Sequence, residues 1–353
     1  MKWIIAIVFG SLLMAIPSMQ NENGKFHNSE TRYSSSLGDT AKIVLAFLTA
    51  PKVDRTPDDL LPIKPIAADQ LCSANEDCLF RLGHSTLLMK IDGLWVLTDP
   101  VLSERASPVQ WAGPKRFHPS PISAEDLPLI DVVVISHDHY DHLDKNTIQT
   151  IQDKVGVFIT PLKVGSHLQR WGVSHDNIIE LDWWQTTTIK GVELIATPSQ
   201  HFSGRSLFDR DTTLWSSWVI IGNQRRIFFS GDSGYFSGFK EIGERYGPFD
   251  FTLIEAGAYN RLWQTIHMMP EESVKAHLDL RGKVMIPIHN GTFDLSMHAW
   301  HEPLSRVSDI AAKRDVQILT PIFGEQVLLD NPVANSGWWQ APPDFSQLET
   351  AKY

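Results

Sequence analysis

An apolar strand that ends in a dense group of histidines and aspartates constrains this chain more than any other feature. Residues 131–135 read Asp-Val-Val-Val-Ile, an apolar and β-branched run that is typical of a buried strand. Residues 136–144 follow directly and read Ser-His-Asp-His-Tyr-Asp-His-Leu-Asp, so the strand carries histidines and carboxylates on the loop at its end. Imidazole nitrogens and carboxylate oxygens this close together are typical of a site for zinc or another first-row metal.

The spacing within this loop predicts ligands for two metal ions. Side chains two residues apart point the same way from an extended segment, so His137 and His139 can bind one ion. Asp141 and His142 come one turn later and can reach a second ion. The alternative is a polar loop whose histidines only bond to the backbone. It is disfavoured because His-x-His-x-Asp-His is far more specific than a lone histidine.

Three other apolar runs end in a residue of a metal-binding type. They lead to His201, Asp232 and His289, the second of them beside small residues that allow close approach. A histidine at one strand end more often has a structural role. Four such ends in one chain indicate a shared site.

The motif after the strand at 131–135 resembles the signature of the metallo-β-lactamase superfamily. The wider sequence is more similar to one branch of it, the N-acyl-phosphatidylethanolamine-hydrolysing phospholipases D. The matching stretches run in order along most of the chain: 82–86, 97–100, 105–108, 113–117, 135–144, 180–184, 197–201, 214–218, 231–235, 247–250, 257–259 and 288–293.

This resemblance implies a binuclear zinc hydrolase and fills every ligand position of the family. The implied ligands of one Zn²⁺ ion are His137, His139 and His201; those of the other are Asp141, His142 and His289; Asp232 bridges the two. The implied reaction is phospholipase D-type hydrolysis of N-acyl-phosphatidylethanolamine to an N-acylethanolamine and phosphatidic acid, by a hydroxide between the two ions. Asp141 would also orient that hydroxide and is the expected catalytic residue.

Residues expected to contact the substrate come from three places in the chain. Tyr140 and His267 match family residues that contact substrate, and Arg205, four residues after His201, can clamp a phosphate. Each has a plain alternative as a packing or surface residue. His84 is either an orienter of a ligand or a buried structural histidine.

Two departures from the family pattern bear on the choice of substrate. Residues 260–262 read Asn-Arg-Leu where the family has Glu-Pro-Arg, and Asn290 replaces a tryptophan. Both are expected near the mouth of the site. The alternative function is therefore a hydrolase of the same fold that acts on another ester, a lactone or a different phosphodiester. An iron oxidoreductase on this scaffold is disfavoured by the all-His/Asp ligand set.

Charge and the first residues indicate where the protein works. A net charge of −10 argues against nucleic acid as a partner, because phosphate binding needs a basic face. Met1-Lys2 and the apolar run 3–16 resemble a secretory signal or an uncleaved anchor, with a buried helix as the alternative. We therefore expect an exported protein, periplasmic or membrane-anchored and facing outside the cytoplasm. Its expected partners are a phospholipid substrate and a membrane surface, and a homodimer is left open.

Export would make a disulfide between Cys72 and Cys78 plausible, with two partly buried thiols as the alternative.

The order of elements predicts an α/β fold. We expect a signal or anchor at 1–20, an irregular lead-in at 21–68 with one helix at 40–49, a hydrolase domain at 69–330 and a tail at 331–353. Two strand-rich halves with helices outside favour two β-sheets packed together between helical layers, the αββα sandwich of the family. The expected strands are 80–82, 85–91, 95–97, 131–135, 157–160, 178–181, 187–189, 192–197, 215–221, 226–230, 283–288 and 316–319. The expected helices of the domain are 145–152, 162–171, 270–280 and 303–313.

Overall fold

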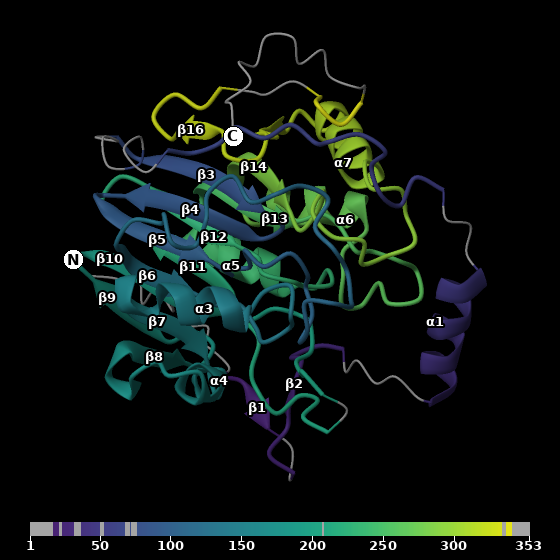
Figure 1. Ribbon diagram of the computed structural model, residues 1–353. Helices are drawn as coiled ribbons and strands as arrows, with labels where there is room; N and C mark the ends of the chain where they lie inside the picture. Colours follow the sequence, from purple (N-terminus) through teal and green to yellow (C-terminus); the bar gives the residue numbers. More distant parts are fainter. Residues whose placement is uncertain are drawn as a thin grey trace, which may run out of the picture.

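Two seven-stranded β-sheets packed face to face form the centre of the molecule (Figure 1). The computed structural model describes residues 17–20, 23–31, 37–49, 53–67, 71, 76–206, 208–333 and 337–340. Most of the proposed signal segment and Cys72 lie outside these residues, and the domain boundaries stay predictions. Cys78 is a buried free thiol.

The first sheet has the strand order β16-β3-β4-β5-β6-β7-β8. Its strands are β3 (Cys78–Gly83), β4 (Thr86–Ile91), β5 (Leu94–Thr98), β6 (Ile130–Val134), β7 (Val155–Pro161), β8 (Ile178–Leu181) and β16 (Gln326–Leu328). Strands β3, β4 and β5 are antiparallel, and β5 to β8 are parallel. Asp92 and Gly93 both have positive φ, the conformation that a tight two-residue hairpin turn between β4 and β5 requires.

The second sheet has the strand order β15-β14-β13-β12-β11-β10-β9. Its strands are β9 (Thr186–Ile189), β10 (Val192–Thr197), β11 (Ser217–Ile221), β12 (Arg226–Phe229), β13 (Phe249–Glu255), β14 (Gly282–Ile288) and β15 (Gln317–Ile318). Strands β12 to β15 are parallel. Strand β10 runs in the same direction, because it is antiparallel to β11 and β11 is antiparallel to β12.

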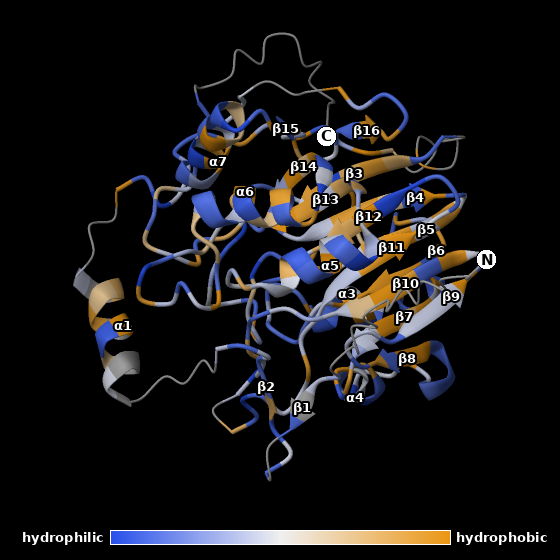
Figure 2. Ribbon diagram, turned by 180° about the vertical axis from the view of Figure 1, so that it is seen from behind, coloured by the Kyte–Doolittle hydropathy of each residue, from blue (hydrophilic) through white to orange (hydrophobic). Residues whose placement is uncertain are grey.

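The helices cover the outer faces of the two sheets, which confirms the αββα sandwich. They are α3 (Lys145–Ile151) and α4 (Gly165–Arg170) on the first sheet, and α5 (Gly238–Tyr246), α6 (Pro270–Asp279) and α7 (Glu302–Lys313) on the second. Figure 2 shows hydrophobic strands in the centre and helices that carry both colours. The alternating strands fill the space between the sheets with apolar side chains, such as Val132, Val134, Phe229 and Leu253.

Outside the sandwich lie a short hairpin of β1 (Met19–Gln20) and β2 (Phe26–His27) and the helix α1 (Leu37–Thr49). Helix α1 stands at the edge of the molecule in Figure 1, apart from the layers. None of the helices in the described ranges combines the length and apolar character that a membrane span needs.

Two expectations about secondary structure are corrected. The helix expected at 162–171 is limited to α4, because Lys163 has a left-handed φ of 68° that an α-helix cannot contain. Helix α5 and strand β13 were not expected at all. Two glycines in a nine-residue segment weaken the helical signal of α5, and β13 mixes charged with apolar residues although it lies in the middle of its sheet.

Candidate metal centre

The seven proposed ligands meet where the two sheets adjoin. The loop after β6 carries four of them, and His201, Asp232 and His289 follow β10, β12 and β14. All four strands point to the same edge of the sandwich, where residues that follow parallel strands come together. The indole of Trp218 on β11 links the sheets beside this loop, since its Nε1 donates to the carbonyl of Ile135 at 3.0 Å.

Three imidazoles form the first group of the cluster. The His139 Nδ1 lies 2.8 Å from the Nε2 of His137 and 3.2 Å from the Nε2 of His201. The His201 Nδ1 is 2.9 Å from the carbonyl of Ile266, so it carries the proton and the Nε2 lone pair faces the group. Burial and the neighbouring imidazoles hold the pKa of His137 well below its ordinary value. Three neutral nitrogens that converge in this way suit a metal ion.

The second group contains Asp141, His142 and His289. The Asp141 Oδ2 lies 3.3 Å from the His289 Nε2 and 3.5 Å from the His142 Nε2. Burial acts to raise the pKa of Asp141, but the adjacent His142 outweighs it and holds this pKa well below its ordinary value. Asp141 is therefore ionised and supplies an anionic ligand.

Asp232 lies between the two groups. Its Oδ2 is 3.1 Å from His142 Nε2 and 3.0 Å from His289 Nε2 in the second group. It is 3.9 Å from His137 Nε2 and 3.7 Å from His201 Nε2 in the first. The Asp232 Oδ1 and the Nε2 atoms of His142 and His289 are buried without a hydrogen-bond partner among the described residues. Unpartnered buried ligand atoms of this kind fit a pair of bound cations, which would satisfy them.

Asp99 holds His142 and was not expected in the site. This fully buried carboxylate lies directly after β5 and accepts hydrogen bonds from the backbone N–H of Ser136 at 2.6 Å and from the His142 Nδ1 at 2.6 Å. The bond to Nδ1 directs the Nε2 of His142 towards the cluster. The same signal that marks the other strand ends, an apolar run followed by an acidic residue, could have identified Asp99.

Glu255 is the second residue that the sequence reasoning missed. It ends β13 and is fully buried. One carboxylate oxygen accepts from the backbone N–H of Met268 at 2.6 Å, and the other lies 2.8 Å from the His267 Nδ1. Burial and the nearby Asp232 raise the pKa of Glu255 well above its ordinary value. Glu255 thus fixes the ring of His267, whose centroid is 5.1 Å from that of His201.

His84 is buried against the second group. Its Nε2 lies 3.1 Å from the Asp141 Oδ2, and its ring centroid is 4.0 Å from that of His289. Its position is that of a residue that orients Asp141.

Of the three expected substrate-binding residues, only His267 lies beside the cluster. The Arg205 guanidinium donates to the carbonyls of Asp138 at 2.6 Å and Leu143 at 2.8 Å, and it lies 4.0 Å from the centre of the Tyr140 ring. The Tyr140 hydroxyl in turn donates to the Arg205 carbonyl at 2.9 Å. These two side chains line a different pocket and hold the ends of the ligand-bearing loop.

Asn290 corrects another expectation, because it does not face the mouth of the site. Its side chain is buried and accepts a 2.7 Å hydrogen bond from the guanidinium of Arg81. Asn260 and Arg261 are at the surface, close in sequence to Trp263, which lines the mouth.

An open cavity of about 260 Å³ lies over the cluster. Four proposed ligands, His139, Asp141, Asp232 and His289, line it together with His267. The remaining lining residues are apolar: Ile43, Phe47, Phe202, Ala258, Trp263, Ile266 and Leu295. Helix α1 supplies two of them, and its Phe47 ring stacks on that of Trp263 with 5.7 Å between centroids. The cavity therefore joins polar ligand atoms to an apolar wall.

Comparison with known proteins agrees with this site. Residues 94–290 match the family model described as the beta-lactamase superfamily domain. An N-acyl-phosphatidylethanolamine-hydrolyzing phospholipase D of Caenorhabditis elegans is 35% identical over 86% of this chain and 92% of its own. An uncharacterized protein of Mycobacterium tuberculosis is 47% identical over 73% of this chain and 70% of its own. The solved structure of Igni18, a metallo hydrolase from Ignicoccus hospitalis, shares the fold with a TM-score of 0.56 and 21% identity, over 72% of this chain and 98% of its own.

Proposed function

The chain belongs to the N-acyl-phosphatidylethanolamine-hydrolysing phospholipase D-like branch of the metallo-β-lactamase superfamily and is a metal-dependent hydrolase, and we propose that it is a zinc phosphodiesterase acting on that lipid. Its products would be an N-acylethanolamine and phosphatidic acid. The observation that carries this proposal is the cavity in which apolar walls meet the ligand cluster. A lipid phosphodiester has the same two parts, a charged phosphate and long acyl chains.

The two groups of ligands would each hold one zinc ion, with Asp232 between them. Zinc bound there would lower the pKa of a water molecule towards neutrality and neutralise charge on the phosphate oxygens. The protein's own residues prepare the site. Asp99 sets the tautomer of His142, and Glu255 sets the orientation of His267 at the cavity wall. The apolar lining would lie against the acyl chains of the lipid.

We also propose a membrane surface as a partner and a location outside the cytoplasm. Helix α1 supports the first proposal, because Ile43 and Phe47 line the cavity while Leu45 is 60% exposed. An apolar side chain exposed on a helix beside the site could enter a bilayer edge and bring the cavity to its substrate. The apolar run at 3–16 supports export or anchoring.

Product analysis of the purified, zinc-loaded protein tests the proposed reaction. N-acyl-phosphatidylethanolamine in mixed micelles should give N-acylethanolamine and phosphatidic acid, identified by mass spectrometry. In ¹⁸O-labelled water the label should enter the phosphatidic acid, because the bond to phosphorus on the ethanolamine side is cut. Diacylglycerol as product, or hydrolysis of a lactone in place of the phospholipid, would contradict the proposal and favour the alternative ester.

Phosphatidylethanolamine without the N-acyl chain is the matched substrate control. It carries the same phosphodiester but lacks one chain for the apolar wall, so we expect slower hydrolysis. The Asp232→Asn variant is the control for contaminating hydrolases and should lose activity.

A further inference from the structure

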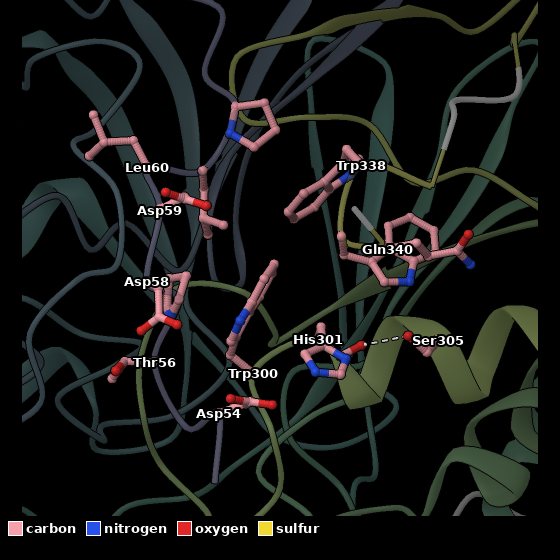
Figure 3. A pocket seen from close by; sticks show the side chains of 14 residues that line it. Asp54, Thr56, Asp58, Asp59, Leu60, Trp300, His301, Ser305, Trp338 and Gln340 are labelled. Carbon is pink, nitrogen blue, oxygen red and sulfur yellow. Dashed lines mark hydrogen bonds between the residues drawn. The ribbon is translucent and has the colours of Figure 1, made fainter. Parts of the chain in front are cut away.

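A further pocket lies away from the metal centre, between the lead-in segment and the end of the described chain. It has a volume of about 440 Å³, within the size range of small-molecule sites. Asp54, residues 56–62, the start of α7 with the two residues before it, and residues 338–340 line it. Figure 3 shows Asp58 and Asp59 on one side of this pocket, Trp338 and Gln340 on the other, and Trp300 between them.

Contacts outside the pocket fix its walls. The Trp300 backbone N–H donates to the carbonyl of Asp54 at 2.7 Å, and Arg55 pairs with Asp294 at 2.9 Å. The Trp338 Nε1 donates to the carbonyl of Thr320 at 3.0 Å. The lead-in segment is therefore fastened to the segment that follows His289, and the pocket is a formed feature of the fold.

The lining has the chemistry of a site for an organic cation. Three indoles, of Trp300, Trp338 and Trp339, lie together with three carboxylates, of Asp54, Asp58 and Asp59. No lysine or arginine occurs among the described residues that line the pocket. Indole faces attract ammonium groups through the ring quadrupole, and carboxylates add attraction between opposite charges.

The ligand that suits this lining carries a positive charge on an apolar group, because the indoles supply apolar area and the carboxylates supply negative charge.

We propose that this pocket binds a small organic ammonium ion, such as choline or ethanolamine, either free or as the headgroup of a lipid. The ammonium group lies against the indole of Trp300 and the carboxylates of Asp58 and Asp59. The site is separate from the metal centre, and the inference does not depend on the proposed hydrolytic function.

Calorimetric titration of the full chain with choline tests the proposal. The matched ligand is 3,3-dimethyl-1-butanol, in which carbon replaces the nitrogen and the charge is lost while the shape is kept. Choline should bind about tenfold or more tightly than this alcohol, as expected for a desolvated cation on indole faces. Equal affinities would show a merely apolar pocket and overturn the proposal, as would no choline binding.

Two variants place the binding in this pocket. Trp300→Leu should weaken choline binding about tenfold, whereas Trp111→Leu, a change at an exposed tryptophan outside the pocket, should not. Asp58→Asn is a surface change that preserves folding and should also weaken it, with Asp309→Asn on the exposed side of α7 as control. Unchanged affinity in both pocket variants would overturn the proposal.

A competition experiment separates the two sources of the ligand. If the headgroup of a lipid is the natural ligand, dihexanoyl-phosphatidylcholine below its micelle concentration should compete with bound choline. Half-displacement should then need a lower concentration of this lipid than of unlabelled choline. Failure to displace choline would identify the free ammonium compound as the ligand.

Discussion

Replacing Asp99 by asparagine should weaken one of the two metal sites by changing a proton on His142. Asp99 accepts from Ser136 and from the Nδ1 of His142. If the asparagine oxygen keeps the bond to the Ser136 N–H, its NH₂ group faces the His142 Nδ1. That nitrogen must then accept, so the ring proton moves to Nε2, the atom 3.1 Å from the Asp232 carboxylate. A protonated Nε2 cannot bind a metal ion.

The magnitude follows from the role of such partners. Loss of the group that orients a metal-binding histidine typically costs about 10–100-fold in metal affinity, or roughly 1.4–2.8 kcal/mol at 1.4 kcal/mol per factor of ten. The loss should concern the ion bound through His142. Among the residues that the structure describes, no hydrogen bond joins Asp99 directly to the first group of ligands, His137, His139 and His201, so the ion held there should be retained. An indirect link runs through Ser136, which contacts both Asp99 and the His137 Nδ1.

The assay is the zinc content per chain after dialysis against graded concentrations of a chelator, measured by inductively coupled plasma mass spectrometry. Asp99→Asn should lose one ion at about 10–100-fold lower chelator strength than the wild type. Asp131→Asn is the matched control, because Asp131 also accepts from a backbone N–H but lies near the start of β6, at the end of that strand away from the cluster. Retention of both ions by Asp99→Asn with wild-type affinity would refute the reasoning.

Three further predictions follow from the structure. The variants His137→Ala, His201→Ala and His289→Ala should each lose activity and bind about one zinc ion fewer than the wild type in metal analysis; two full sites in all three would contradict the two-group arrangement. Leu45→Glu should lower the rate of hydrolysis of substrate in vesicles about tenfold, because the free energy of burying one leucine side chain in the membrane is lost. Hydrolysis of a short-chain soluble phosphodiester should be unaffected, and equal losses on both substrates would contradict a membrane role of α1. Burial lowers the pKa of His277 to about 4, so the unfolded chain takes up a proton before the folded chain does as the pH falls below about 6.5. The free energy of unfolding should therefore fall by roughly 1.4 kcal/mol per pH unit between about 6.5 and about 4. Urea unfolding between pH 7 and 5 should show a smaller loss for His277→Gln than for the wild type, and identical losses would exclude this contribution.

The sequence predicted most of the sandwich and the composition of the cluster because both depend on local pattern. Each proposed ligand lies on a loop directly after an apolar run, and such runs form strands whose ends meet. Long-range contacts could not be predicted in this way. Arg205 was expected at the phosphate, but the backbone turns at Gly204, with φ 140°, and the guanidinium bonds to the ligand-bearing loop. Glu255 could not be identified from the sequence, since its partners, the Met268 N–H and His267, lie more than ten residues further along the chain.

The meeting of the two sheets at the cluster has a consequence for how the protein tolerates change. Neither half of the chain contains a complete set of ligands, so the geometry of the centre depends on how one sheet is seated on the other. The Trp218 indole, which reaches from β11 to the Ile135 carbonyl, lies in this interface. Substitutions in the core between the sheets can therefore act on catalysis as interface mutations act on a dimer. They would shift the ligands carried by one sheet relative to those carried by the other. Separately expressed halves would have to reassemble through that core before either could bind its ions with the native geometry.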